Sequence, residues 1–181
     1  MGKTRNSMEA LLLDYRRKGR LIVVIPRFAD FYGPNVMNDL YGRMFISVIH
    51  GKSSIWPVNA DIPHNFTYIE DAAEAKLLVV GESNSYGKIY HVSGEVITAR
   101  QFAEKVYKTA GSQLNLKILS KEFLRISGLF NSNALELIKL LYECSDPYIL
   151  DDSKFKGDFP AFRHTLYDAG IKTWWNGSGL I

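Results

Sequence analysis

The side chains most able to do chemistry follow a short apolar run near the start of the chain. Residues 21–25 form a β-branched run, which predicts a strand buried on both faces, and Asp30, Tyr32 and Asn35 come shortly after it. Because ligands of α/β proteins gather at the carboxyl ends of such strands, Asp30 is a candidate to contact a small polar molecule. The alternative is that Phe31 and Tyr32 are core aromatics and residues 33–34 a turn, and for Phe31 the core interpretation is favoured.

Other ionisable side chains favour structural roles. Asp71 could be a catalytic acid, but at the start of a predicted helix it is more simply a first-turn residue that the helix dipole favours. His64 and His91 could change charge near neutral pH, yet neither belongs to a Cys, His and Asp cluster with metal-ligand spacing. We therefore predict no metal site and assign no catalytic residue.

Composition indicates one globular unit with a substantial core, since the chain has 181 residues and is 46% hydrophobic. With 22 basic and 19 acidic residues, its charge favours no particular partner. The basic run at 16–20 is interpreted as a last helical turn with a glycine cap, and a nucleic-acid or membrane patch is the alternative. A single cysteine, Cys144, and apolar runs too short for a signal peptide or a membrane span predict a cytoplasmic protein.

Apolar spacing predicts alternating helices and strands, with a mostly helical second half. Thr98 is expected to cap a helix. The first helix, followed at once by a buried strand, is half of a β-α-β unit whose first strand would lie upstream of residue 1. Helices are predicted over 8–18, 36–50, 70–80, 99–110, 120–127, 134–143 and 162–175, and strands over 21–25, 53–58, 66–69, 88–92 and 114–119.

Four segments together resemble the NAD(P)-dependent epimerase/dehydratase family, the extended branch of the short-chain dehydrogenase/reductases. VIPRFADFYGPN (24–35) resembles its strand, arginine, aromatic and Tyr-Gly-Pro segment, and FTYIEDAAEA (66–75) its aromatic and Asp-Ala helix entry. YHVSG (90–94) resembles its strand with Ser-Gly, and DDSK (151–154) with WW (174–175) the entry and end of its last helices. The order of the segments is the family's order.

The resemblance implies an α/β fold: a partial Rossmann-type, doubly wound sheet that lacks its N-terminal strands, plus a mostly helical substrate lobe. Residues 1–35 and 66–94 would be the rest of the sheet, and 36–65 and 95–181 the lobe. Phe28 and Ala29 would lie beside the nicotinamide of NAD or NADP. Asp30, Tyr32 and Asn35 would face the substrate, a small molecule for which the family suggests a nucleotide sugar.

Two hallmarks of the family are missing. The sequence has no G-x-x-G-x-x-G, the turn on which such enzymes hold the pyrophosphate. Their Tyr-x-x-x-Lys pair is commonly followed by a glutamate four positions after the lysine; if Glu9 is that residue, the pair falls on Met1 and Arg5. Methionine has no proton to transfer, and a guanidinium differs in geometry from an ammonium group. Dinucleotide binding by this chain alone is therefore not expected.

Three hypotheses of function follow. The first is the C-terminal portion of an NAD(P)-dependent nucleotide-sugar epimerase/dehydratase or related oxidoreductase, inactive alone. The second is a non-catalytic module that pairs with a separate N-terminal half or self-associates through apolar edges. The third and weakest, a nucleic-acid binder acting through residues 16–20, would need salt-sensitive binding.

Overall fold

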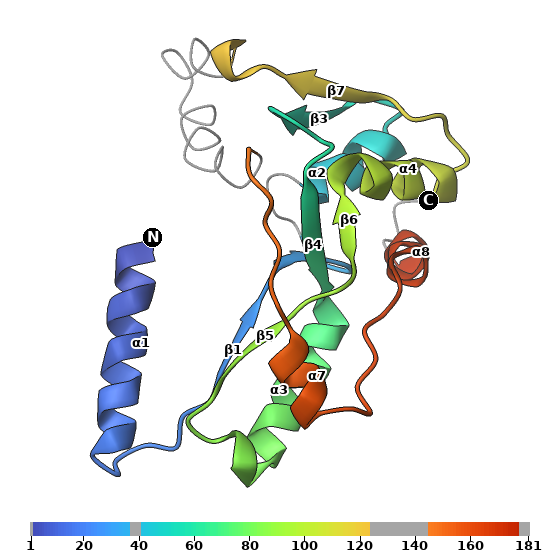
Figure 1. Cartoon of the computed structure of the whole chain (residues 1–181). Coiled ribbons are helices and arrows are strands. Elements are labelled where there is room, and N and C mark those ends of the chain that lie inside the picture. The colour runs from blue at the N-terminus through green and yellow to red at the C-terminus, as the bar shows by residue number, and fades with distance from the viewer. Residues whose placement is uncertain (1, 37–40, 124–144, 178–181) are drawn as a thin grey trace.

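The structure, a computed structural model, describes residues 2–36, 41–123 and 145–177. Figure 1 shows two groups of elements joined by a long strand: β1, β5, α3 and α7 lie in the lower part, and β3, β7, α2 and α4 in the upper part. The fold is α/β with small, mostly parallel sheets, as the sequence predicts for a partial Rossmann-type fold.

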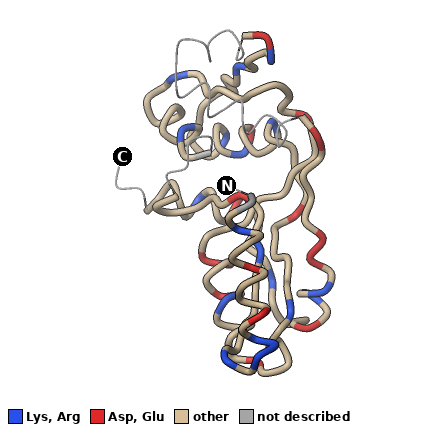
Figure 2. Tube along the Cα trace, turned by 90° about the vertical axis from the view of Figure 1, so that its left-hand side faces the viewer, with Lys and Arg blue, Asp and Glu red and all other residues tan. Residues whose placement is uncertain are grey.

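Helix α1 (Gly2–Arg17) begins earlier than the predicted residue 8 and ends where the basic run was expected to end it. Gly19 has a φ of 67°, the left-handed conformation of a helix C-cap. Asp14 pairs with Lys18 at 2.6 Å and with Arg17 at 3.5 Å. Acidic and basic residues are interspersed along the trace (Figure 2), so the basic run is accompanied by acidic residues.

The first strand differs from its prediction. It was expected at 21–25 with both faces buried, whereas β1 is Ile25–Phe28, and Leu21 and Ile22 are 46% and 74% exposed. The physical reason is pairing: β1 is bonded in parallel to β5 (Ile89–Val92), and within the described residues no second strand lies along its other edge. Residues 21–22 thus have no sheet face to be buried in.

A strand that the sequence did not predict follows at once. β2 (Asp30–Tyr32) pairs in parallel with β4 (Pro63–Tyr68), with Asp30 opposite Phe66, and β4 pairs antiparallel with β6 (Val96–Thr98). The chain therefore changes partner at Ala29, from β5 to β4. Helix α3 (Ile69–Gly81) follows β4, close to the predicted 70–80.

The upper part is built on α2 (Tyr41–Ile49) and α4 (Ala99–Thr109), with β3 (Ser54–Pro57) paired in parallel to β7 (Leu116–Leu119). Thr98 caps α4 as predicted, because its hydroxyl accepts from the amide of Gln101 and the Gln101 side chain accepts from the amide of Thr98. Of the helix predicted at 36–50, residues 37–40 lie outside the described residues.

The C-terminal elements are a 3₁₀ turn η1 (Ser83–Ser85), α7 (Ser153–Asp158) and α8 (Tyr167–Gly177). The last helix starts later than the predicted residue 162, because Asp71 holds the chain before it: its carboxylate accepts from the Thr165 amide at 2.7 Å and from the Thr165 hydroxyl at 2.6 Å. The helix predicted at 134–143 and most of that at 120–127 lie outside the described residues.

Two apolar clusters form the core. The larger joins α2, α4 and α8 to β2 and β4, and the smaller joins α3 and α7 to β1 and β5. The smaller cluster includes Phe155 and Phe159 of the predicted substrate lobe, and the larger includes Tyr32 of the predicted sheet region. The side chains of the two predicted regions are therefore interleaved.

Candidate functional site

A hollow of about 700 Å³ lies between α1, β1 and β5, and we call it the α1–β1–β5 pocket. It combines apolar and aromatic side chains with a few polar groups, the composition of small-molecule sites. Its residues are Arg5, Asn6, Met8, Glu9, Leu12, Ile25, Pro26, Arg27, Phe28, Phe31, His91, Tyr148 and Leu150.

Two phenylalanines supply its aromatic wall. The rings of Phe28 and Phe31 are 5.6 Å apart between centroids and tilted by 42°. The ammonium group of Lys76, on α3, lies 5.4 Å from the centre of the Phe28 ring, which ties that ring to the sheet's covering helix. Phe31, which the sequence favoured as a core residue, is only partly buried and lines the pocket.

An ion pair joins the helix to the strand across the pocket. One guanidinium nitrogen of Arg27 lies 2.7 Å from both carboxylate oxygens of Glu9. This contact holds α1 against β1. Arg5 lies one helical turn before Glu9, so both side chains are on the side of α1 that lines the pocket.

Asp30 does not line this pocket directly but is connected to it through His64. The Nε2 atom of His64 lies 3.2 Å from a carboxylate oxygen of Asp30, and the imidazole is 4% exposed. The His64 ring contacts those of Phe66 and Tyr148, with centroids 4.6 Å and 5.1 Å away and ring planes tilted by 36° and 32°. Tyr148 lines the pocket, so the Asp30–His64 pair forms its outer support.

The other predicted site residues are placed differently. Ala29, at the break between β1 and β2, is 3% exposed, and Asn35 is exposed in a left-handed turn with a φ of 61°. Tyr32 is 1% exposed within the larger core, and desolvation strongly raises its pKa above the usual value. Its placement is that of the core alternative weighed for it from the sequence.

Residues that sequence reasoning treated as structural or did not consider also form the wall. His91 lies directly across from Arg27 on the neighbouring parallel strand, and Leu150 is fixed by Asn65, whose side-chain oxygen accepts from the Leu150 amide at 3.3 Å. Alternate residues of a strand point to the same face of the sheet, and His91 is paired with Arg27, so the two side chains lie on one face. This alternation is the feature of the sequence that could have indicated His91. Tyr148 reaches the wall through an isolated parallel bridge to His64, with its amide donating to the carbonyl of Pro63 at 3.1 Å, a pairing between distant segments that the sequence does not reveal.

Asp71 lies in the first turn of α3, as predicted, and both of its carboxylate oxygens accept hydrogen bonds from Thr165.

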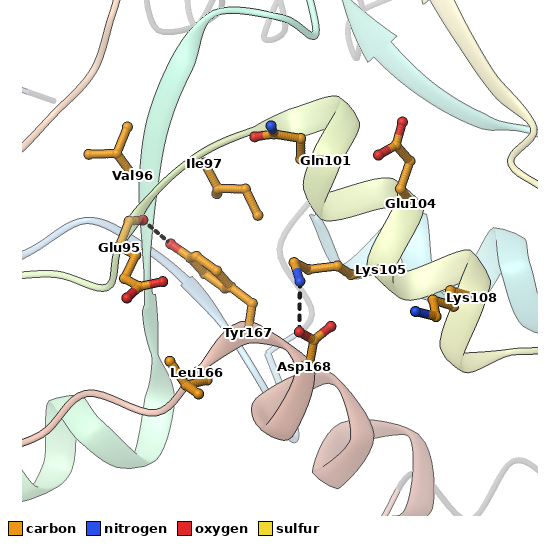
Figure 3. Close-up of a pocket in the computed structure, with 10 residues that line it drawn as sticks. All are labelled: Glu95, Val96, Ile97, Gln101, Glu104, Lys105, Lys108, Leu166, Tyr167 and Asp168. Carbon is orange, nitrogen blue, oxygen red and sulfur yellow. Dashed lines mark hydrogen bonds and ion pairs between the residues drawn. The ribbon is translucent and has the colours of Figure 1, made fainter.

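A second hollow, of about 680 Å³, lies between α4, β6 and the start of α8 (Figure 3). Its central polar groups are already paired: Lys105 with Asp168 at 2.7 Å, and the Tyr167 hydroxyl with the carbonyl of Glu95 at 2.6 Å. The same hydroxyl accepts from the Phe66 amide at 3.1 Å. These contacts join α8 to α4 and β4. The pairing of Lys105, Asp168 and Tyr167 is therefore explained by packing between elements, and we do not assign a ligand to this hollow.

Across residues 2–36, 41–123 and 145–177, no group of three or more His, Cys, Asp or Glu side chains is arranged to hold a metal ion. Among the same residues, every helix is too short or too polar to cross a membrane.

Comparison with known proteins identifies solved structures of similar fold. No protein-family model and no curated protein matches the sequence. The chain is similar to a UDP-glucuronic acid 4-epimerase from Bacillus cereus in complex with UDP-glucuronic acid and NAD: TM-score 0.76, 17% identity, 97% of this chain and 51% of that one. A dTDP-glucose 4,6-dehydratase from Bacillus anthracis in complex with NAD gives a TM-score of 0.69 at 16% identity, over 93% of this chain and 48% of that one.

A UDP-N-acetylglucosamine 4-epimerase from Bacillus cereus gives a TM-score of 0.67 at 20% identity, over 91% of this chain and 49% of that one. The chain thus spans about half the length of these structures. It has the fold of that half.

Proposed function

We propose that this chain is the substrate-side portion of an NAD(P)-dependent nucleotide-sugar epimerase/dehydratase or a related oxidoreductase. The observation that carries the proposal is the overlap of nearly the whole chain with about half of an epimerase that holds NAD and UDP-glucuronic acid. The α1–β1–β5 pocket supports it, because the pocket is bounded by the segment 25–31 that carries the family resemblance.

The proposed roles follow the resemblance, with one change. Phe28 and Ala29 form the wall beside the nicotinamide, and Phe31 extends that wall. Asp30 and Asn35 face the substrate, with Asp30 held by His64. Tyr32 is assigned to the core, because its ring packs against those of Tyr68, Phe102 and Tyr167 within the larger apolar cluster.

The cofactor, when bound, supplies the hydride acceptor; the residues of this chain bind and orient. The Glu9–Arg27 ion pair supports the register in which Arg5 takes the lysine position of the family's Tyr-x-x-x-Lys pair. Arg5 supplies a fixed positive charge to the pocket but cannot exchange protons near neutral pH. The proposal therefore includes no turnover by this chain alone, and a reducing, cytoplasmic location in keeping with its single cysteine.

The test uses the two halves of the dinucleotide as separate probes. In ¹⁵N-resolved NMR titrations of the whole chain, nicotinamide mononucleotide at millimolar concentration should shift the amides of Phe28, Ala29 and His91. Adenosine monophosphate should leave them unchanged, because the fold that binds the adenine half is not among the described elements. The Phe28→Ala variant should abolish the shifts, and Phe123→Ala, an exposed phenylalanine outside the pocket, should not. Shifts with the adenine probe alone would contradict the proposal.

A second candidate function, association through the edge of β1, has its own observation. One edge of β1 is covered by no described strand, and Met8 and Leu11 on α1 and Ile22 in the segment before β1 are 59%, 56% and 74% exposed. An open strand edge flanked by apolar side chains is a pairing surface for another polypeptide. We propose that a complementing N-terminal half covers it, or a second copy of this chain.

Sedimentation velocity tests this second function. The chain alone should self-associate in the micromolar range, and Ile22→Asp should shift it toward the monomer. Leu77→Asp, at an equally exposed position on α3, is the matched control and should have no effect. A monomer at all concentrations, indifferent to a supplied N-terminal half, would refute the association.

A further inference from the structure

We propose that Asn65 is a positioning residue of the α1–β1–β5 pocket, because its carboxamide, together with Ser93, holds the segment 148–150 in place as part of the pocket wall. The inference rests on the proposed function, since it concerns the site to which the nicotinamide end of the cofactor is assigned. It commits to a specific effect: a weaker hold on this segment lowers the affinity of the folded chain for the pocket's ligand.

The segment 148–150 lies along an edge of β4. Strands β2 and β6 pair with β4 along opposite edges, and β2 begins only at Asp30. Before that point the edge on the β2 side is taken by Tyr148, which bridges to His64 and donates its amide to the carbonyl of Pro63 at 3.1 Å. In Figure 1 the chain that leads into α7 accordingly runs beside β4, on the side away from β6. A single bridge fixes one residue, so the rest of the segment needs a partner of its own.

Asn65 supplies this partner. Its side-chain oxygen accepts from the Leu150 amide at 3.3 Å, and its side-chain nitrogen donates to the Leu150 carbonyl at 3.3 Å. The same nitrogen donates to the Ser93 hydroxyl at 2.9 Å, and this hydroxyl donates to the Leu150 carbonyl at 3.4 Å. A carboxamide both donates and accepts, so it can pair with the two backbone groups of one residue as a neighbouring strand would.

The position of this contact makes it a support of the pocket. Asn65 and Ser93 are 2% and 3% exposed, and neither is among the residues that line the pocket. Tyr148 and Leu150 do line it, whereas Ile149 between them is 49% exposed, the alternation of an extended segment. Asn65 therefore acts on the pocket through the backbone that carries two of its wall side chains.

The experiment measures the affinity of the whole chain for nicotinamide mononucleotide by ¹⁵N-resolved NMR titration. The net contribution of one hydrogen bond corresponds to about fivefold in an equilibrium constant. Asn65→Ala removes the pairing with both backbone groups of Leu150, and we expect it to weaken binding about fivefold, less than the bonds together, because the bridge to His64 remains. Ser93→Ala removes only the hydroxyl that joins Asn65 to the Leu150 carbonyl and should weaken binding about twofold.

The matched control is Thr67→Ala. Thr67 lies on the same strand, is 1% exposed and donates to the Val92 carbonyl at 3.1 Å, so its loss destabilises β4 without touching the segment 148–150. It should lower the melting temperature, as Asn65→Ala does, but leave the affinity unchanged. In a chain that already carries Tyr148→Ala and Leu150→Ala, Asn65→Ala should change the affinity by less than about twofold, because the side chains that it positions are gone.

Unchanged affinity in both Asn65→Ala and Ser93→Ala would overturn the inference, as would an equal weakening by Thr67→Ala. Either result would reduce Asn65 to a residue of stability alone, and the proposed function would stand, because the unmodified chain binds the probe. Absence of binding by the unmodified chain would overturn the proposed function and the inference together.

Discussion

Replacing Asp71 by alanine tests the assignment of this carboxylate to structure instead of catalysis. Asp71 is 6% exposed and accepts two short hydrogen bonds from Thr165, at 2.7 Å from the amide and 2.6 Å from the hydroxyl. The loss would release the segment that leads into α8 and leave two donors without their acceptor.

The magnitude follows from the number of bonds. A hydrogen bond to a charged group contributes about 1.5–3 kcal/mol, and two bonds that share one partner are not additive. We expect Asp71→Ala to lower the free energy of unfolding by about 3 kcal/mol. Thr165→Val removes the hydroxyl donor alone and should cost about 1–2 kcal/mol. Glu70→Ala, in the same helical turn, removes a favourable dipole contact and should cost about 0.5 kcal/mol.

Urea unfolding, followed by the fluorescence of the tryptophans, measures these changes. The double variant Asp71→Ala with Thr165→Val should lose less free energy of unfolding than the sum of the two single losses, because both substitutions remove the same hydrogen bond. A loss for Asp71→Ala no larger than for Glu70→Ala would refute the structural role. A fully stable Asp71→Ala variant that no longer binds the pocket's ligands would revive the catalytic alternative.

Two further predictions concern packing and pH. Gly170→Ala should lower the free energy of unfolding by about 1–3 kcal/mol, because a Cβ there would lie 2.7 Å from the Tyr32 hydroxyl and 3.0 Å from the Tyr68 ring, whereas Gly177→Ala in the same helix meets nothing within 4 Å; equal melting temperatures of the two variants would contradict this. Hydrogen bonds from Lys88 and Tyr90 hold the pKa of Asp158 below its usual range. The stabilisation that these bonds give the fold is therefore complete at pH values above the pKa of an unfolded aspartate, and it is lost as the pH falls through the lowered pKa of Asp158. Lys88→Gln should therefore lower the melting temperature at pH 7 and converge with the unmodified chain near pH 2, and a difference that stays constant with pH would show that the ion pair is not its source.

Most of the helices and strands could be predicted because their signals are local. The capping box at Thr98 and Gln101 and the apolar run of α3 each carry their information within one turn. The fold class followed from the same alternation of helices with β-rich runs.

The errors came from contacts between distant segments. The apolar run at 21–25 reads as a buried strand, but a strand's limits depend on its neighbours, and β1 pairs along one edge alone within the described chain. The switch of the chain at Ala29, from β5 to β4, leaves no mark in the sequence, so β2 was missed.

The candidate site was partly predictable for the same reason. Phe28 was expected at the site from the family resemblance of residues 24–35, and it lines the pocket. His91 reaches it through strand register and Tyr148 through a bridge to His64, and the burial of Tyr32 depends on packing against α8. Whether the assigned site residues bind a ligand remains a prediction.

The proposed function places the nicotinamide side of a dinucleotide site on this chain, without the phosphate-binding side. The most direct measurement compares the affinity of the isolated chain for NADH and for reduced nicotinamide mononucleotide, by the fluorescence that the two ligands share. We expect millimolar binding of both, with a ratio close to one, because the given sequence contains no glycine-rich turn to hold the pyrophosphate. Micromolar binding of NADH, many times tighter than that of the mononucleotide, would contradict it.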